Sequence, residues 1–212
     1  MSKIVIFDSG IGGELFADYV AAEIPTLEII RVIDWRHAND YLSSRKSARK
    51  AATEALRPYI GTVDLIIFAN FFLSLTSLKY FRRKFKNQKF SGFNLNLKRP
   101  ICPTLILTTS AVRRTKSFRI LEKSCSHPSI LVCDAWPNLI DDGELSDAEF
   151  QSASSKITTT PRRIILACTH FSDLAPTLHQ IGPQIKIDDG FHRALIEACH
   201  TLKLRGYYHK SK

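Results

Sequence analysis

The segment LIIFANFFLSLTSL, residues 65–78, begins as a continuous apolar run and then changes to the spacing of an amphipathic helix. A short apolar run of this kind is typical of a strand buried on both faces. The segment therefore predicts a strand that passes directly into a helix. Such turns commonly hold catalytic side chains in α/β proteins. This one offers Ala69, Asn70 and Phe71, which include no nucleophile and no base.

The same alternation of strand and helix continues along the chain. Apolar strand patterns lie at 4–8, 27–34, 63–69, 103–109, 129–135, 162–168 and 184–189. Helical patterns lie at 14–23, 44–59, 72–86, 111–123, 145–156, 173–180 and 190–203. Apolar strands separated by helices predict an α/β fold with mostly parallel sheets covered by helices. The polar segment 87–100 interrupts this rhythm, and we interpret it as a crossover between two α/β halves.

Composition limits the class of protein. The chain has 212 residues, of which 44% are hydrophobic and 24% charged, as in ordinary globular domains. It has no apolar run long enough to span a membrane, and its N-terminus enters a strand pattern without the features of a signal peptide. We therefore expect a soluble, cytoplasmic protein without a membrane partner. The five cysteines show no CxxC spacing, so we expect reduced thiols and no metal site.

The net charge of +10 is high for this length. The densest basic run is KYFRRKFKNQKF, residues 79–90, in which aromatic residues alternate with Lys and Arg. One interpretation is the end of an amphipathic helix, with the aromatic rings in the core and the cations in water. The other is a nucleic-acid-binding patch. No recognisable nucleic-acid motif accompanies the run, so we favour the first interpretation and regard nucleic acid as an unlikely partner.

Two strand ends carry polar residues suited to chemistry. FDSGIGG, residues 7–13, places Asp8 and Ser9 before a glycine-rich entry to a helix, where backbone N–H groups favour an anion. A glycine-rich turn with a structural Asp8 is the alternative. IILACTHFSDL, residues 164–174, places Cys168 beside His170 at a second strand end, a setting that favours a thiolate. A buried, inert cysteine is the alternative there.

Together these segments resemble the glutamate racemase branch of the aspartate/glutamate racemase superfamily. FDSGIGG is similar to the family's FDSG-x-GG opening, and LACTHFS (166–172) to its GCTHYP segment. TVDLIIFANFFLS (62–74) falls where the family has a strand ending in CNT. LTTSAVRRT (107–115) and WPNLIDDG (136–143) fall where it has a Thr-containing turn and an acidic LVxxxEEG stretch.

The resemblance implies two pseudosymmetric α/β domains with a cleft between them, here 1–97 plus 185–212 and 98–184. It implies cofactor-independent racemisation, in which one cysteine from each half exchanges a proton with the substrate's α-carbon. The catalytic residues would be Cys168, Asp8 and His170. Ser9, Asn70 and Thr169 would bind a small amino acid or carboxylic acid. A homodimer is left open.

Several positions depart from the family pattern. Ala69 stands where the first catalytic cysteine is expected, and Phe71 where a Thr follows it. Ala111 occupies the place of the second-half Thr, although Thr108, Thr109 or Ser110 could substitute. The segment 39–42 (Asn-Asp-Tyr-Leu) stands in place of PYG.

Three hypotheses follow from these departures. In the first, Cys168 acts alone as a one-thiol isomerase or decarboxylase, with Phe71 and Phe72 lining an apolar pocket. In the second, the chain is an inactive homologue with a binding role. In the third, Tyr41, Asp40 or Cys102 replaces the missing thiol.

Overall fold

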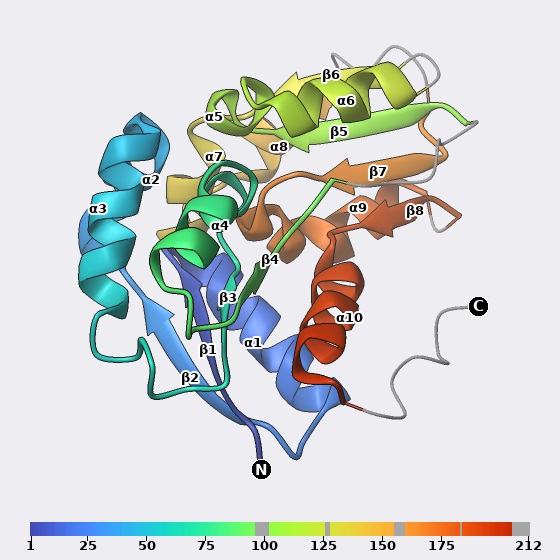
Figure 1. The fold of residues 1–212 in the computed structure, drawn as a ribbon. Coiled ribbons are helices and arrows are strands. Elements are labelled where there is room, and N and C mark those ends of the chain that lie inside the picture. Colours follow the sequence, from blue (N-terminus) through green and yellow to red (C-terminus); the bar gives the residue numbers. More distant parts are fainter. Residues whose placement is uncertain (96–101, 126–127, 155–159, 183, 205–212) are drawn as a thin grey trace. The chain divides into compact units, whose positions relative to one another are not determined.

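The computed structural model describes residues 1–95, 102–125, 128–154, 160–182 and 184–204 (Figure 1). The chain divides into two compact units. Unit 1 comprises 1–94 and 190–212, and unit 2 comprises 95–189. Each unit is built on its own parallel sheet.

The sheet of unit 1 has the strand order β2-β1-β3-β4, with every neighbouring pair parallel. Its strands are β1 (Lys3–Asp8), β2 (Glu28–Ile33), β3 (Leu65–Phe68) and β4 (Phe90–Gly92). Its helices are α1 (Ile11–Glu23), η1 (Trp35–His37), α2 (Ala38–Ser43), α3 (Arg45–Leu56), α4 (Phe71–Lys84) and α10 (Phe191–Leu202).

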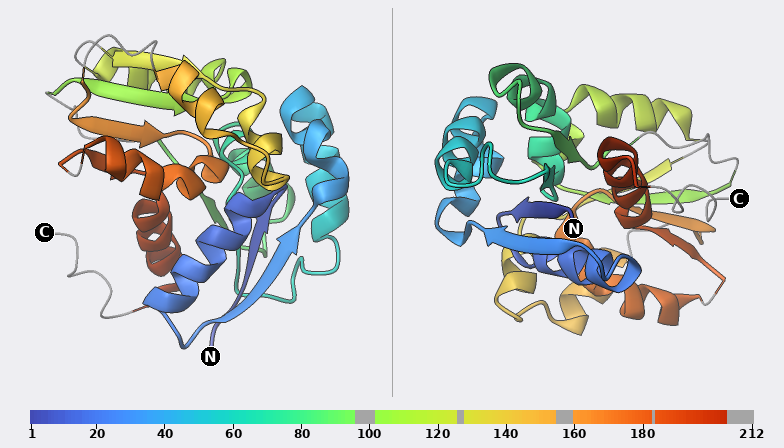
Figure 2. Two further views of the ribbon diagram at one scale, coloured as in Figure 1. Left: turned by 180° about the vertical axis from the view of Figure 1, so that it is seen from behind. Right: turned by 60° about the horizontal axis from the view of Figure 1, so that its bottom comes forward.

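Both faces of this sheet are covered, which explains its continuous apolar strands. Figure 2 shows α1 and α10 side by side, and both helices pack on the sheet. On the opposite face, Val5 and Phe7 of β1 join α2, α3 and α4 in one buried cluster. Successive strand residues point to opposite faces, so the central strands β1 and β3 contribute apolar side chains to two layers.

Unit 2 repeats this topology, with the strand order β6-β5-β7-β8 and parallel pairing throughout. Its strands are β5 (Thr104–Thr108), β6 (Pro128–Val132), β7 (Arg163–Leu166) and β8 (Lys186–Asp188). Its helices are α5 (Ser110–Arg113), α6 (Lys116–Ser124), α7 (Trp136–Asp141), α8 (Asp147–Ser154), η2 (Thr169–Leu174) and α9 (Ala175–Ile181). The matching strand orders confirm the predicted pair of pseudosymmetric α/β sheets.

Each of the seven predicted strands is present, with ends shifted by at most three residues. The sequence missed β4, which lies inside the segment 87–100 that we interpreted as a crossover; residues 96–100 of that segment lie outside the described ranges. It also missed η1, α2 and α7. The ladder between β7 and β8 attaches residues 186–188 to the sheet of unit 2.

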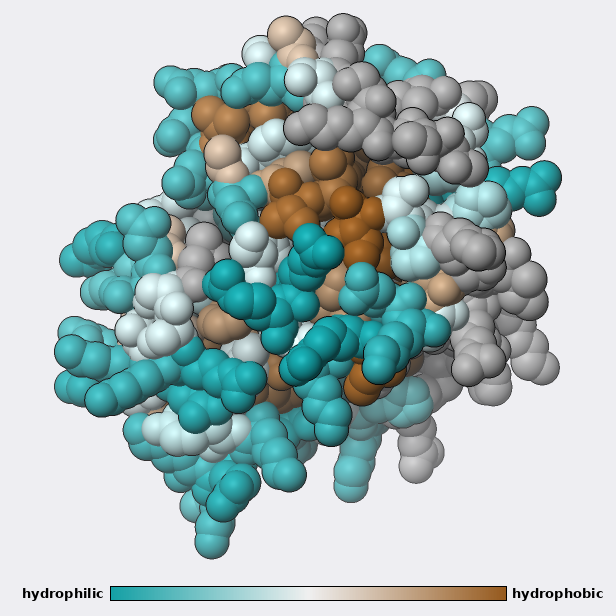
Figure 3. All heavy atoms as spheres, turned by 90° about the horizontal axis from the view of Figure 1, so that it is seen from above, coloured by the Kyte–Doolittle hydropathy of each residue, from teal (hydrophilic) through white to brown (hydrophobic). Residues whose placement is uncertain are grey.

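Hydrophilic side chains cover most of the coloured surface drawn in Figure 3, and apolar residues show in a smaller central area. None of the helices within the described ranges is both long enough and apolar enough to cross a membrane.

Candidate active site

The turn after β7 in unit 2 holds a chain of three titratable side chains. Cys168 is the N-cap residue of η2, and its Sγ lies 3.5 Å from Nδ1 of His170. On the other side of the imidazole, Nε2 lies 3.2 Å from Oδ2 of Asp141 at the end of α7. The side chains of His170 and Asp141 are 8% and 14% exposed. A buried imidazole thus connects a partly exposed thiol to a carboxylate.

This order of groups can move a proton to and from sulfur. When the Nε2 proton is donated to Asp141, Nδ1 presents its lone pair to the thiol of Cys168. The imidazole can then accept the thiol proton, and the carboxylate stabilises the imidazolium that forms. The three residues therefore have the geometry of an acid/base group that acts at the sulfur atom.

Sequence reasoning had placed Cys168 and His170 together, and the structure brings them into contact. It had not given Asp141 a role. Asp141 lies 29 residues before His170 and in a different helix, so only the fold joins them. The available signal was the acidic pair in WPNLIDDG, directly before Gly143.

The other hydroxyls near this end of unit 2 take part in structural hydrogen bonds. Thr109 caps α5 by accepting a hydrogen bond from the N–H of Val112. Ser110 donates from both its N–H and its Oγ to Asp134, each over 2.6 Å. Thr169, expected to bind substrate, is buried directly after Cys168. The turn after β5 is therefore stabilised by its own hydroxyl groups.

The corresponding end of unit 1 contains a buried network without a thiol. The N–H of Ser9 donates to Oδ1 of Asp8 over 2.7 Å. The side-chain amide of Asn70 donates to Oγ of Ser9 over 3.1 Å. The amide oxygen of Asn70 also accepts from the N–H of Leu73 over 2.9 Å, which caps α4. The structure therefore brings Asp8, Ser9 and Asn70 together and gives Asn70 a role in capping α4.

Gly13 explains part of the glycine-rich segment FDSGIGG. A Cβ at this position would lie 2.5 Å from Cβ of Asp8 and 2.7 Å from Cδ1 of Ile33. Both distances are well below van der Waals contact. This glycine therefore allows α1 to pack closely against β1, which is a different reason from the close approach of a ligand that the sequence suggested.

The aromatic residues that follow Ala69 and Asn70 contribute to the interior of unit 1. The ring of Phe71 packs on Phe93, with 4.8 Å between ring centroids. Phe72 packs against the buried cluster beneath α3 and α4. Both rings therefore take part in the packing of unit 1. We expected them to line an apolar ligand pocket, which is a different role.

Tyr41, one candidate to replace the missing thiol, is fully buried. Its hydroxyl donates to Oδ2 of Asp34 over 2.6 Å, and His37 lies 2.9 Å from the same oxygen. Burial, followed by the hydrogen bond to Asp34, raises the pKa of Tyr41 above its usual value. A phenol in this environment retains its proton. It is therefore a poor substitute for a thiol that must gain and lose one.

The backbone identifies the residue in unit 1 that corresponds to Cys168. The N–H of Ala69 donates to the carbonyl of Phe7, and the N–H of Ala167 donates to the carbonyl of Leu107, both over 2.8 Å. The next residues, Asn70 and Cys168, are the N-cap residues of the following helices. The backbone register therefore matches Cys168 with Asn70, and Ala69 with Ala167.

Within the described ranges, no group of three His, Cys, Asp or Glu side chains is arranged to hold a metal ion. Cys168, His170 and Asp141 instead follow one another in a line of pairwise contacts.

No family model matches the sequence, and no curated protein matches it. Solved structures, however, share the fold, and that fold is the one found in amino-acid racemases. Glutamate racemase from Escherichia coli, solved with L-glutamate and the activator UDP-MurNAc-Ala, has a TM-score of 0.80 and 20% identity, covering 96% of this chain and 83% of its own. Glutamate racemase from Campylobacter jejuni has a TM-score of 0.77 and 24% identity, covering 93% and 84%.

A relative with a different substrate also shares the fold. Allantoin racemase from Klebsiella pneumoniae has a TM-score of 0.60 and 15% identity, covering 98% of this chain and 92% of its own. The comparisons therefore define the two-sheet racemase fold, and the fold alone does not select a substrate.

Proposed function

We propose that the chain belongs to the aspartate/glutamate racemase superfamily and acts as a single-cysteine enzyme on a small carboxylic acid. The observation that carries this proposal is the line of contacts from Cys168 through His170 to Asp141. We further propose that each compact unit is one racemase-like domain, and that the protein is cytoplasmic. We assign the lost cysteine to the position of Ala69, and this assignment rests on the resemblance to the CNT motif.

The reaction would consist of proton transfer on one face of the α-carbon. The hydrogen on that carbon is a very weak acid, so its removal needs an activated base and stabilisation of the developing charge. In an exchange reaction the Cys168 thiolate takes this proton and later returns one. In a decarboxylation the bond to the carboxylate breaks, its electron pair remains on the α-carbon, and the Cys168 thiol supplies a proton. His170 then passes a replacement proton to the sulfur.

As the resemblance implies, Asp8 would assist the acid/base chemistry, and Ser9, Asn70 and Thr169 would bind the ligand. Asp8, Ser9 and Asn70 offer polar groups at the end of β1 and β3, and Thr169 offers one beside Cys168. Ala69, Asn70 and Phe71 cannot carry a proton to the second face, because a methyl, an amide and a phenyl group have no suitable acid or base. In this proposal the chain therefore lacks the second thiol that two-cysteine racemisation of glutamate needs.

A specific observation favours a second candidate, an inactive homologue that binds a ligand. The side chain of Asn70 already uses both its amide nitrogen and its oxygen within the fold. If this turn served only the stability of the fold, its polar side chain would be used in hydrogen bonds of this kind.

The test is incorporation of solvent deuterium at the α-carbon, followed by NMR, with both enantiomers of glutamate and aspartate and with 2-substituted malonates as substrates. We expect the wild-type protein to incorporate deuterium at the α-carbon of at least one substrate, on one face only. Cys168→Ser should abolish this incorporation. Cys102→Ser, a matched thiol variant in the same unit, should retain it. Binding without exchange in the wild-type protein would support the inactive homologue. Exchange accompanied by interconversion of the glutamate enantiomers would refute the single-cysteine proposal.

A further inference from the structure

A second feature of unit 1 is a groove between α3 and α4. It encloses about 610 Å³ and adjoins a further hollow of about 510 Å³ along α4. Eight cationic side chains line the two: Arg45, Lys46, Arg49, Lys50, Arg57, Lys79, Arg83 and Lys84. Glu54 is the one carboxylate among the lining residues. We call these eight residues the basic groove.

The cations of the basic groove outnumber the carboxylates that line it among the described residues. Within the described ranges, none of the eight cations forms an ion pair with a carboxylate, whereas Arg31 pairs with Glu14 and Asp18, and Arg82 with Glu197. Cations gathered in one groove repel each other and create a positive potential there. An anionic ligand would relieve that repulsion.

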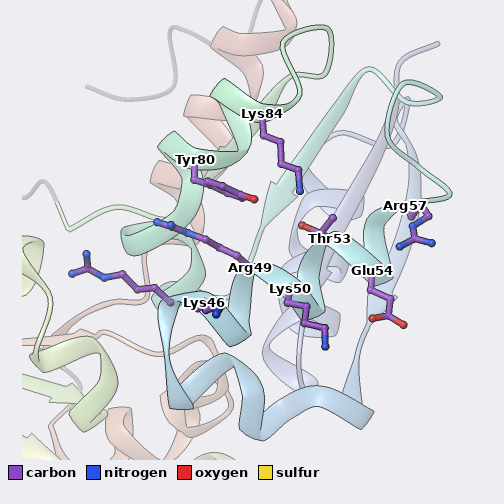
Figure 4. Close-up of a pocket in the computed structure, with 9 residues that line it drawn as sticks. Lys46, Arg49, Lys50, Thr53, Glu54, Arg57, Tyr80 and Lys84 are labelled. Carbon is purple, nitrogen blue, oxygen red and sulfur yellow. The ribbon is translucent and has the colours of Figure 1, made fainter.

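Some of these groups are also held in place. Arg49 donates from Nε to Ser77 Oγ over 3.2 Å and from Nη2 to the carbonyl of Thr76 over 2.9 Å. Its guanidinium lies 4.6 Å from the centre of the Tyr80 ring. Figure 4 shows Arg49 alongside that ring and Lys84 reaching from α4 toward Thr53 of α3. Thr53 Oγ1 is buried and has no hydrogen-bond partner among the described residues. The groove therefore holds one guanidinium in a fixed position and has one buried hydroxyl that no described residue bonds.

The spacing of the cations fits an extended anion better than a single phosphate. On α3 and its C-terminal end they run from Arg45 to Arg57, about 18 Å along the helix axis at 1.5 Å per residue. A second row on α4 starts at Lys79 and ends at Lys84. An isolated anion would contact only two or three of these groups. A chain of regularly spaced negative charges would contact most of them.

We propose that the basic groove binds the sugar–phosphate backbone of single-stranded nucleic acid without sequence preference. A charged groove combined with an aromatic ring is the usual design of such sites, since the cations follow the phosphates and the ring or a guanidinium plane stacks on a base. Here Tyr80 and Arg49 supply that platform.

The proposal modifies our interpretation of residues 79–90. Phe81 and Phe90 lie in the core, as expected for an amphipathic helix end. Tyr80 packs against the same cluster and also lines the groove, and α3 adds a second basic row that the run itself did not reveal.

The test is fluorescence anisotropy of a labelled oligodeoxythymidine about a dozen nucleotides long, titrated with the full chain at several salt concentrations. The groove variant combines Lys46→Gln, Lys50→Gln and Lys84→Gln, all exposed. The matched control combines Lys116→Gln, Lys123→Gln and Lys186→Gln, exposed residues of unit 2, and lowers the net charge equally. We expect about a tenfold or greater loss of affinity for the groove variant alone. Its slope of log K against log salt should fall by about 2.

Three outcomes would overturn the proposal. The first is the absence of binding by the wild-type protein. The second is equal weakening in the groove and control variants, which would indicate general charge attraction. The third is displacement of the labelled oligonucleotide by polyaspartate or duplex DNA as effectively as by unlabelled single strand. That result would mean that the groove binds another polyanion. Thermal unfolding of each variant checks that a lost affinity is not a lost fold.

Discussion

The turn after β3 in unit 1 and the turn after β7 in unit 2 occupy the same place in the same topology, but their side chains do different work. In unit 1, Asn70 caps a helix and holds Ser9, so its polar atoms are used inside the fold. In unit 2, Cys168 at the matching N-cap makes no side-chain capping bond and contacts the imidazole of His170 instead. The polar side chain of one turn is used in hydrogen bonds of the fold, and that of the other contacts a second titratable side chain.

Under the proposed function, one half of a symmetric scaffold has lost its part of a two-sided chemistry. A racemase that delivers protons to two faces of one carbon needs an acid/base group on each side. The loss of one such group would leave the strand order unchanged. The predictions below test whether reactivity belongs to unit 2 and structural stability to the turn of unit 1.

The largest expected effect concerns the reactivity of Cys168. Because its Sγ contacts Nδ1 of His170, we expect Cys168 to be the fastest of the cysteines toward iodoacetamide at neutral pH, measured by peptide mass spectrometry. Burial raises the pKa of the Cys125 and Cys199 thiols, so these should react slowly. His170→Asn should slow the alkylation of Cys168 by about ten- to hundredfold, because thiolate is the reactive species.

His179→Asn is the matched control, since His179 is exposed on α9 of the same unit. It should leave the rate unchanged. Asp141→Asn should give a smaller reduction than His170→Asn, because it weakens the imidazolium without removing the base. An unchanged Cys168 rate in His170→Asn would mean that the contact seen in unit 2 does not activate the thiol, and the contrast between the two turns would disappear.

The second effect concerns the packing around Asp8. Gly13→Ala forces a Cβ to 2.5 Å from that of Asp8, where little can move. Overpacking of this kind costs about 3 kcal/mol, and the higher helix propensity of Ala returns up to about 1. We expect a net loss of about 2 to 3 kcal/mol in urea denaturation. Gly182→Ala is the control, because its Cβ would meet only the flexible end of Ile185. Equal stability of the two variants would show that α1 can move away from β1.

The sequence predicted the strands well for a physical reason. Strands buried on both faces are apolar over their buried residues, so residues 65–68 and 164–166 stand out as continuous apolar runs. The missed strand, β4, has only three residues, of which one is Ser91 and one is Gly92, and such a segment carries no apolar pattern. The helix α7 was missed as well; Pro137 in its first turn and Gly143 just beyond its end were the signals for it.

The candidate site could be predicted only where its residues are neighbours in the chain. Cys168 and His170 share one turn, and their contact follows from local geometry. Asp141 joins them through the packing of α7 beside η2, which depends on the tertiary fold. The same limit applies to the basic groove, since a row of cations on α3 and another on α4 become one site only when the helices lie together.

The third prediction compares the two N-cap residues directly. Asn70→Ala removes the cap on Leu73 N–H and the bond to Ser9, and should cost about 2 kcal/mol. Asn70→Ser keeps a capping oxygen but is too short to replace the bond to Ser9, so it should recover about half of that loss. Cys168→Ala removes no cap and should cost less than about 1 kcal/mol. Thermal and urea unfolding measure all three. A larger loss in Cys168→Ala than in Asn70→Ala would reverse the assignment of roles.

The smallest effect concerns Tyr41. Its pKa is raised in the folded state, so its protonated phenol stabilises unit 1. Tyr41→Phe removes the hydrogen bond to Asp34 and should cost about 1.5 kcal/mol at pH 8. The folded protein keeps the phenol proton above pH 10, where the unfolded chain releases it, so this stabilisation is complete below about pH 10 and falls by about 1.4 kcal/mol per pH unit above it. The difference between wild type and Tyr41→Phe in urea denaturation should therefore shrink to about zero near pH 11. A difference that stays constant from pH 8 to 11 would mean that Tyr41 releases its proton in the folded state, and would return it to the candidates for proton transfer in unit 1.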